Sequence, residues 1–194
     1  MPNETNIIIT EHNLVVMPVR KAGCSSITEA CKTRIGRQHF HLRNNSFVPE
    51  WKARGALVAT FVRHPFDRFV SFYEHLVIRS PYKALIPFGI TGGMAFEDVA
   101  ELVAGVSDED ADIHFRGQVF SLSLDGEFLP NWIGTFETLY SSWADFCEHT
   151  TAPLPKDLPH RNKSDRRPWH TYYNDRTMAL IRERYAADFE VFGY

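Results

Sequence analysis

The chain alternates short apolar runs with amphipathic segments, and this alternation predicts an α/β fold. Leu14–Pro18 and Ala56–Val62 are apolar at nearly every position, which is typical of strands buried on both faces of a parallel sheet. A helix is expected after each run, over Ser26 to about Arg34 and over Pro65 to about Arg79. Proline suits the start of the second helix, because its missing N–H would have no intrahelical partner there.

The second half of the chain continues this pattern. We expect a helix over Phe96–Val103, a hairpin over Phe120–Leu129 that turns at Asp125-Gly126, a strand over Asn131–Phe136, and helices over Thr138 to about His149 and Asp175 to about Ala187. Residues 80–93 and 150–168 contain several prolines or glycines and are expected to be loops. The pattern therefore predicts a single domain over residues 1–194, with a mostly parallel central sheet flanked by helices.

Composition narrows the classes of function. The 194 residues are 44% hydrophobic and 23% charged with a formal net charge of −3, which is typical of a globular protein and disfavours a nucleic-acid-binding one. Residues 20–43 hold six Lys and Arg and one acid, whereas residues 97–112 hold seven acids and no Lys or Arg. A basic patch on a mildly acidic chain indicates a small anionic ligand.

Cysteine usage and hydropathy indicate a cytoplasmic location. Cys24, Cys31 and Cys147 are widely spaced, so we expect neither a disulfide framework nor a Cys-based zinc site. The apolar run Ile7–Ile9 is too short for an export signal, and no run reaches the roughly 18 residues of a membrane span.

The turn after the first buried strand is suited to an anion. It consists of Arg20, Lys21, Ala22, Gly23, Cys24, Ser25 and Ser26. Small residues let backbone N–H groups approach a phosphate or sulfate, and the following helix adds its dipole. Lys21 supplies a charge, whereas the nucleotide triphosphatase loop would need a Lys directly before the Ser. Alternatively, Ser25 caps the helix and Lys21 is solvated.

A second polar group follows the second buried strand. Arg63 lies at the strand end, where α/β proteins bind ligands, and Ser71 lies about two helical turns further along the chain. A guanidinium and a hydroxyl suit a phosphate monoester. Alternatively, Arg63 pairs with Asp67 and Ser71 lies on an exposed face.

Together these segments resemble the PAPS-dependent sulfotransferases, in particular the carbohydrate sulfotransferase branch (sulfotransferase family 2). Lys21–Ser26 matches the K-x-G-x-[ST]-[ST] loop that holds the 5′-phosphosulfate of 3′-phosphoadenosine 5′-phosphosulfate (PAPS) in that family. Arg63–Ser71 matches the R-[DNH]-P-x-x-R-x-x-S element that holds the 3′-phosphate. Ile133–Leu139 resembles the family's Y-E-x-L segment, Pro159–Ser164 its late basic loop, and Asp188–Tyr194 the terminal D-F-E-x-F-G-Y of bacterial members.

The resemblance implies a fold like that of the P-loop nucleotide kinases and in-line transfer of the sulfuryl group from PAPS to a hydroxyl of an acceptor, expected to be a carbohydrate. It places Lys21 at the transferring group. Phe136 is expected near the adenine or in the core, and Arg161 and Lys163 near the nucleotide, near an anionic acceptor, or in solvent. Cys24 stands where Thr or Ser is common, which leaves its backbone N–H as the contact.

The resemblance also implies a His or Glu general base about twenty residues before Arg63. His41 lies 22 residues before it and is the expected base, with His39 as a supporting group on the same face of an extended segment. His114 resembles the His of an H-W-x-P segment in related sulfotransferases, and is the rival base or an acceptor-site residue. The three histidines raise the question of zinc, but the reaction needs no metal and none is expected.

Two other classes of protein are compatible with these motifs. A small-molecule kinase would share the fold, although the missing Lys-Ser/Thr pair argues against it. A non-catalytic nucleotide-binding module would keep Lys21, Arg63 and Ser71 and transfer nothing.

Overall fold

The computed structural model describes residues 5–34, 40–159 and 166–194, which fall into two compact units. The sheet unit comprises the described residues up to Arg63 and those from Phe120 to residue 159. The helical unit comprises His64–Val119 and the chain from residue 166 onward. Each unit is described by itself, and a single domain over residues 1–194 stays a prediction.

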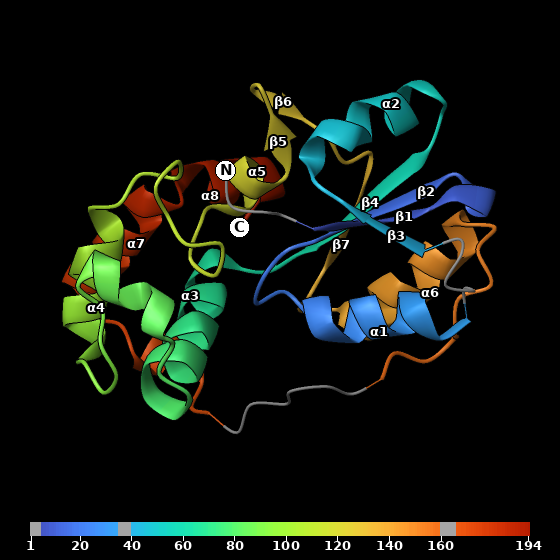
Figure 1. Ribbon diagram of the computed structural model, residues 1–194. Helices are drawn as coiled ribbons and strands as arrows, with labels where there is room; N and C mark the ends of the chain where they lie inside the picture. Colours follow the sequence, from blue (N-terminus) through green and yellow to red (C-terminus); the bar gives the residue numbers. More distant parts are fainter. Residues whose placement is uncertain (1–4, 35–39, 160–165) are drawn as a thin grey trace. The chain divides into compact units, whose positions relative to one another are not determined.

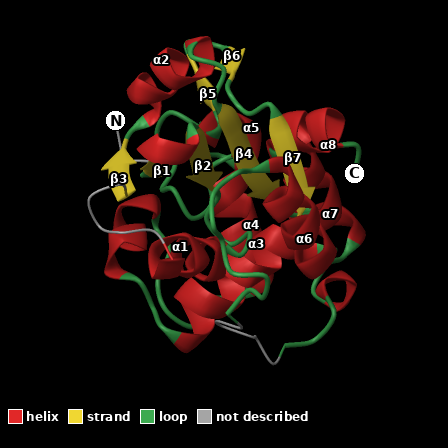
Figure 2. Cartoon of the chain, turned by 90° about the vertical axis from the view of Figure 1, so that its right-hand side faces the viewer, coloured by secondary structure: helices red, strands yellow, loops and turns green. Residues whose placement is uncertain are grey.

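The sheet unit contains a five-stranded sheet in the order β3-β1-β2-β4-β7 (Figure 2). Its strands are β1 (Asn6–Ile9), β2 (Leu14–Pro18), β3 (Phe40–Arg43), β4 (Leu57–Val62) and β7 (Trp132–Thr135). The β2–β4 and β4–β7 pairs are parallel, and β1 is antiparallel to both β2 and β3. Four strands therefore run in one direction against β1, which confirms the α/β fold with a mostly parallel sheet.

The helices of the sheet unit cover both faces of this sheet. Helices α1 (Cys24–Arg34) and α6 (Leu139–His149) lie on one face and α2 (Val48–Ala53) on the other (Figure 1). Trp143 and Phe146 of α6 pack with Ile27 of α1 against the strands. Cys31 lies in the same core, where burial raises the pKa of its thiol to about 12. Burial from both faces explains the apolar runs of β2 and β4.

Several boundaries in the sheet unit differ from the prediction. Helix α1 begins at Cys24, two residues before the expected start. The hairpin is shorter than expected, with β5 (Ser123–Leu124) and β6 (Glu127–Phe128) joined by Asp125-Gly126, both at positive φ as a tight hairpin turn requires. Its expected first residues belong instead to helix α5 (Gln118–Ser121).

The helical unit is built around α3 (Pro65–Tyr73), which continues as the π-helix η4 (Glu74–Arg79). Its other helices are α4 (Phe96–Ala104), α7 (Asp175–Arg184) and α8 (Ala186–Phe192), with the short 3₁₀ helices η5 (Lys83–Phe88) and η6 (Trp169–Thr171); the sheet unit adds η1 (Thr10–His12) and η3 (Asn45–Phe47). The expected final helix over Asp175–Ala187 is wrong in its extent: it is interrupted at Tyr185, whose buried hydroxyl donates to the Phe115 carbonyl (2.6 Å).

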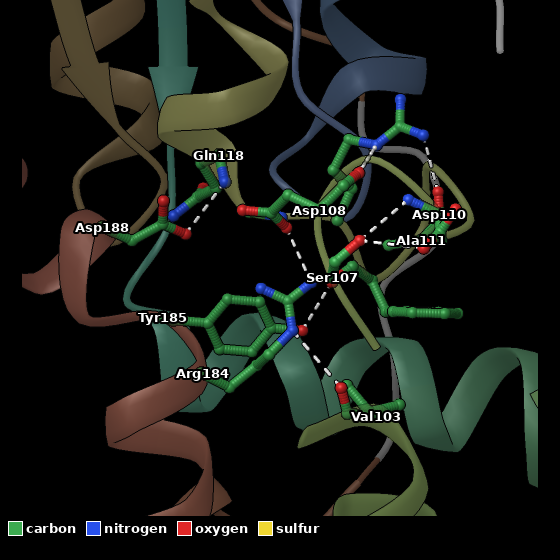
Figure 3. A network of polar contacts seen from close by, with 12 residues as sticks. Val103, Ser107, Asp108, Asp110, Ala111, Gln118, Arg184, Tyr185 and Asp188 are labelled. Carbon is green, nitrogen blue, oxygen red and sulfur yellow. Dashed lines mark hydrogen bonds and ion pairs between the residues drawn. The ribbon is translucent and has the colours of Figure 1, made fainter. Parts of the chain in front are cut away.

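The terminal D-F-E-V-F-G-Y segment is tied to the helical unit by a buried carboxylate. Asp188 is 1% exposed and accepts hydrogen bonds from the backbone N–H groups of Gln118 (3.0 Å) and Val119 (2.8 Å) (Figure 3). Burial raises the pKa of Asp188 above its ordinary value, and the attraction of the buried Arg68 together with these hydrogen bonds opposes the rise. The motif therefore joins the last helix to the chain that leaves the helical unit at Val119.

A second polar contact in this network surrounds Asp108. Arg184 donates to the Asp108 carboxylate (2.6 Å) and, through Nε, to the Val103 carbonyl (3.3 Å) (Figure 3). The Gly117 N–H donates to the same Asp108 oxygen (2.8 Å). These contacts fasten the acidic segment of the sequence, residues 97–112, to α7.

Asp188→Ala should lower the free energy of unfolding by about 3–5 kcal/mol, because it leaves two buried amides and the Arg68 charge without the carboxylate. The exposed Glu190, two residues along the same motif, supplies the control variant Glu190→Ala. Urea denaturation of both variants measures the difference. Equal, small losses would show that Asp188 contributes no more than a surface residue.

Candidate active site

The β2–α1 loop, taken as residues 19–26 and therefore including the first three residues of α1, has a backbone suited to an anion. Lys21 and Gly23 both have positive φ, +70° and +78°, so the chain reverses tightly after β2. The first intrahelical hydrogen bond runs from the Ile27 N–H to the Gly23 carbonyl (3.1 Å). The amides of residues 24–26 therefore precede it at the positive end of the helix dipole, where phosphate and sulfate bind.

Side chains of this loop differ in exposure. Arg20 and Ser25 are exposed, Lys21 is half-buried, and Ala22 and Ser26 are buried. Lys21 is not a glycine, so its positive φ carries a strain of about 1–3 kcal/mol that its surroundings must sustain.

Arg63 makes one of the contacts that hold Lys21 in its strained backbone conformation. It follows the last residue of β4, its side chain is buried, and its Nη1 donates to the Lys21 carbonyl (2.9 Å). One N–H of the guanidinium fork is thus directed at the loop. The alternative partner considered from sequence, Asp67, forms an ion pair with Arg166 in the helical unit.

Phe136 follows the last residue of β7 and lies beside the same guanidinium. The Arg63 Cζ is 4.0 Å from the centroid of the Phe136 ring. The Phe136 N–H donates to the Val62 carbonyl (2.7 Å), which fixes its backbone next to the end of β4. A Cβ on Gly23 would stand 3.4 Å from both Phe136 and Leu139. The carboxyl ends of β2, β4 and β7 therefore meet around Arg63.

A row of hydroxyl groups continues from Phe136 into α6. Thr135 and Thr138 Oγ1 are 2.6 Å apart, and Thr138 Oγ1 is 3.0 Å from Ser142 Oγ. The Ser142 Oγ also accepts a hydrogen bond from the Thr135 N–H (3.2 Å). Sequence analysis did not single out these residues, because hydroxyls spaced three and four apart are also typical of an ordinary helix start.

The expected base His41 lies on the edge strand β3. It pairs with Ile8 of β1, which pairs with Val15, three residues before the end of β2. Because β1 lies between β3 and β2, the backbones at His41 and Val15 are roughly 10 Å apart. Arg43, the last residue of β3, is nearer the edge where the loop begins. His39 lies outside the described residues.

The rival base His114 lies in the helical unit and is held by a carboxylate. Its Nδ1 is 2.7 Å from Asp112 Oδ1, and its backbone N–H donates to the same oxygen (2.9 Å). Burial of the Asp112 carboxyl opposes its ionisation, but the hydrogen bonds from His114 outweigh this and lower the pKa of Asp112. The ring of Tyr82 packs edge to face with the His114 ring, with 5.4 Å between the ring centroids. An ionised Asp112 fixes the orientation of His114, as the carboxylate does in a Ser-His-Asp triad.

The model of the sulfotransferase family matches residues 5–194. The chain belongs to the sulfotransferase family. The match spans both compact units and every motif described above, which confirms the resemblance to sulfotransferases. No curated protein and no solved structure matches the chain.

Membership makes the protein a sulfotransferase, an enzyme that transfers a sulfuryl group. Within the described ranges, no helix is both long and apolar enough to cross a membrane. The same ranges contain no group of three or more His, Cys, Asp or Glu side chains arranged to hold a metal ion.

The other predicted site residues of this sulfotransferase belong to the helical unit or fall outside the described residues. Ser71 is half-buried on α3 of the helical unit. Arg161 and Lys163 lie outside the described residues. Of the late basic segment, Arg166 pairs with Asp67, and Arg167 lies over the ring of Tyr172 (4.9 Å).

Sequence analysis did not identify the carboxylate partner of His114 in the helical unit. Asp112 stands two residues before His114, and the D-x-H spacing is a local signal that could have identified it. The contact of Phe136 with Arg63 had no such signal, because the two residues are far apart in the sequence.

Gly23→Ala should reduce sulfuryl transfer at least about tenfold, because an L side chain disfavours the positive φ of residue 23 and would shift the backbone amides of the loop. Gly55 has a similar φ, +76°, with nothing within 4 Å of an added Cβ, so Gly55→Ala is a matched control for backbone strain. Initial rates and thermal unfolding of both variants separate the effects. Comparable rates in the two variants would remove the loop geometry from catalysis.

Proposed function

We propose that the protein transfers the sulfuryl group of PAPS to a hydroxyl of an acceptor, with a carbohydrate as the acceptor class. One observation carries the proposal: the hydrogen bond from Arg63 to the Lys21 carbonyl. It joins the K-x-G-x-S-S loop to the first residue of the R-H-P-x-x-R-x-x-S element, the two segments that resemble the PAPS-binding elements of the family. The match to the sulfotransferase family supports the reaction class.

The residues of the β2–α1 loop suit the sulfuryl donor. PAPS supplies an activated sulfuryl group and leaves as a bisphosphate, so negative charge builds on its 5′-phosphate during transfer. The amides of Cys24, Ser25 and Ser26 would hold that phosphate, and Lys21 would neutralise the growing charge. Arg63 and Ser71 would bind the 3′-phosphate, which a guanidinium matches with paired N–H donors.

The acceptor hydroxyl needs a base to take its proton, and we propose His41 for that role. Its spacing before Arg63 is that of the family's base, and its strand β3 lies in the same sheet as β2, the strand that leads into the β2–α1 loop. His114 is the second candidate, and the specific observation that favours it is its contact with Asp112. Either residue must present a neutral imidazole nitrogen to accept the proton of the acceptor hydroxyl.

Arg63→Ala should weaken binding of 3′-phosphoadenosine 5′-phosphate, the product of PAPS, by roughly ten- to a hundredfold. The loss corresponds to about 1.5–3 kcal/mol for a charge-assisted contact. Calorimetry with this bisphosphate and with adenosine 5′-phosphate measures the preference for the 3′-phosphate, which the variant should lose.

Arg54 supplies the control for this experiment. It is an exposed arginine of the same unit that pairs with Glu50, so Arg54→Ala removes one positive charge without touching the loop. Equal affinity of the parent protein for the two nucleotides would refute the assignment of a 3′-phosphate site. If ATP stabilises the protein strongly against thermal unfolding and the bisphosphate does not, the result would favour the alternative function, a small-molecule kinase.

His41→Ala should lower the rate of sulfuryl transfer by about 10²–10⁴-fold, the usual contribution of a general base, with binding of the bisphosphate retained. His114→Ala and Asp112→Asn should cause smaller losses. Steady-state rates and calorimetry on the same preparations give both quantities. If His114→Ala and Asp112→Asn are both inactive while His41→Ala turns over normally, the base is His114 and His41 has no part in proton transfer.

A further inference from the structure

Phe136 contacts both elements that the proposed function assigns to the nucleotide. Its ring lies 4.0 Å from the Arg63 Cζ on one side, and its Cδ2 stands 3.4 Å from where a Gly23 Cβ would be. Its backbone is fixed by the hydrogen bond to the Val62 carbonyl, the residue directly before Arg63. One aromatic residue, 73 positions away from Arg63 in the sequence, thus packs against both the guanidinium and the turn of the loop.

This contact restricts what Arg63 can do. A guanidinium over an aromatic face is attracted by the ring quadrupole, and the attraction grows when solvent is excluded, as it is around this side chain with 7% exposure. The planar fork stacked on Phe136 directs Nη1 at the Lys21 carbonyl (2.9 Å). That carbonyl belongs to the residue with φ of +70°, so the ring acts through Arg63 on the most strained residue of the loop.

We propose that Phe136 is a positioning residue that holds the Arg63 guanidinium against the β2–α1 loop and thereby sets the enzyme's selectivity for a 3′-phosphorylated nucleotide. The assignment rests on the proposed function for the identity of the ligand. It requires an aromatic face at position 136, since an aliphatic side chain of similar volume fills the space but has no quadrupole.

Two other roles for Phe136 make different predictions. A ring that stacks on adenine would weaken every adenine nucleotide equally when removed, whether or not the nucleotide has a 3′-phosphate. A ring that only fills the core would be replaced by Leu with loss of stability alone. If the ring acts through Arg63, its removal should weaken only the part of the nucleotide affinity that depends on the 3′-phosphate.

The test compares Phe136→Leu with Phe136→Tyr, which keeps the aromatic face, and with Tyr140→Leu, which removes an exposed ring from the nearby start of α6. Calorimetry measures the binding affinity for 3′-phosphoadenosine 5′-phosphate and, separately, for adenosine 5′-phosphate. Phe136→Leu should weaken the bisphosphate about three- to thirtyfold and leave adenosine 5′-phosphate nearly unchanged, whereas Phe136→Tyr and Tyr140→Leu should keep the parent preference. Equal weakening of both nucleotides, or none, would overturn the proposal.

A second readout needs no ligand and separates this proposal from the function on which it rests. Amide hydrogen exchange of peptides covering residues 19–27 should be faster in Phe136→Leu than in the parent protein, and unchanged in Tyr140→Leu. If the parent protein fails to bind the bisphosphate, the proposed function falls, and the exchange data still decide whether Phe136 holds the loop. Unchanged exchange would overturn the positioning role; Phe136→Met serves in both measurements if the Leu variant does not fold.

Discussion

The candidate site depends on one buried guanidinium, because Arg63 connects three chain segments that are distant in the sequence. It lies at the end of β4, donates to the Lys21 carbonyl beyond β2, and stacks on Phe136 beyond β7. A buried charge is costly unless its donors and its face find partners. The parallel order β2-β4-β7 brings these partners to one edge of the sheet, with Arg63 on the central strand of the three.

This arrangement explains why the loop needs no triphosphatase signature. In a chain without the Lys-Ser/Thr pair, positive charge reaches the loop from Lys21 within it and from Arg63 beside it. The glycine at position 23 allows the second reversal of the backbone and leaves room for Phe136. The loop conformation therefore depends on contacts with Arg63 and Phe136 as well as on the loop's own residues. The backbone amides of the loop are oriented before an anion binds.

Sequence patterns identified the elements whose signals are local and long enough. The structure confirms the strands predicted from the apolar runs of β2 and β4 and the start of α3 at Pro65, because burial on both faces and the chemistry of a helix start leave clear patterns in the sequence. Strands β1 and β3 have four residues each, too few for a periodic signal. The break at Tyr185, where the backbone leaves helical geometry with φ −113° and ψ 28°, has no signal in the helical pattern.

The sequence nominates candidate residues for the site, but it does not give the contacts among them. Motif spacing selected Lys21 and Arg63, but the stacking of Arg63 on Phe136 depends on the sheet order, which joins strands that are far apart in the chain. The pairing of His114 with Asp112 has a local signal in its D-x-H pattern, whereas the spacing before Arg63 favours His41.

The central claim is that PAPS is the donor and that its sulfuryl group is transferred. Incubation of the purified protein with PAPS labelled in the sulfuryl group, with a panel of glycans as acceptors, measures this directly, and parallel reactions with ATP labelled in the terminal phosphate serve as the comparison. The account predicts that the sulfur label appears on a glycan and that the phosphate label does not. Transfer of phosphate, or tight binding of PAPS with no transfer to any hydroxylated acceptor, would contradict it.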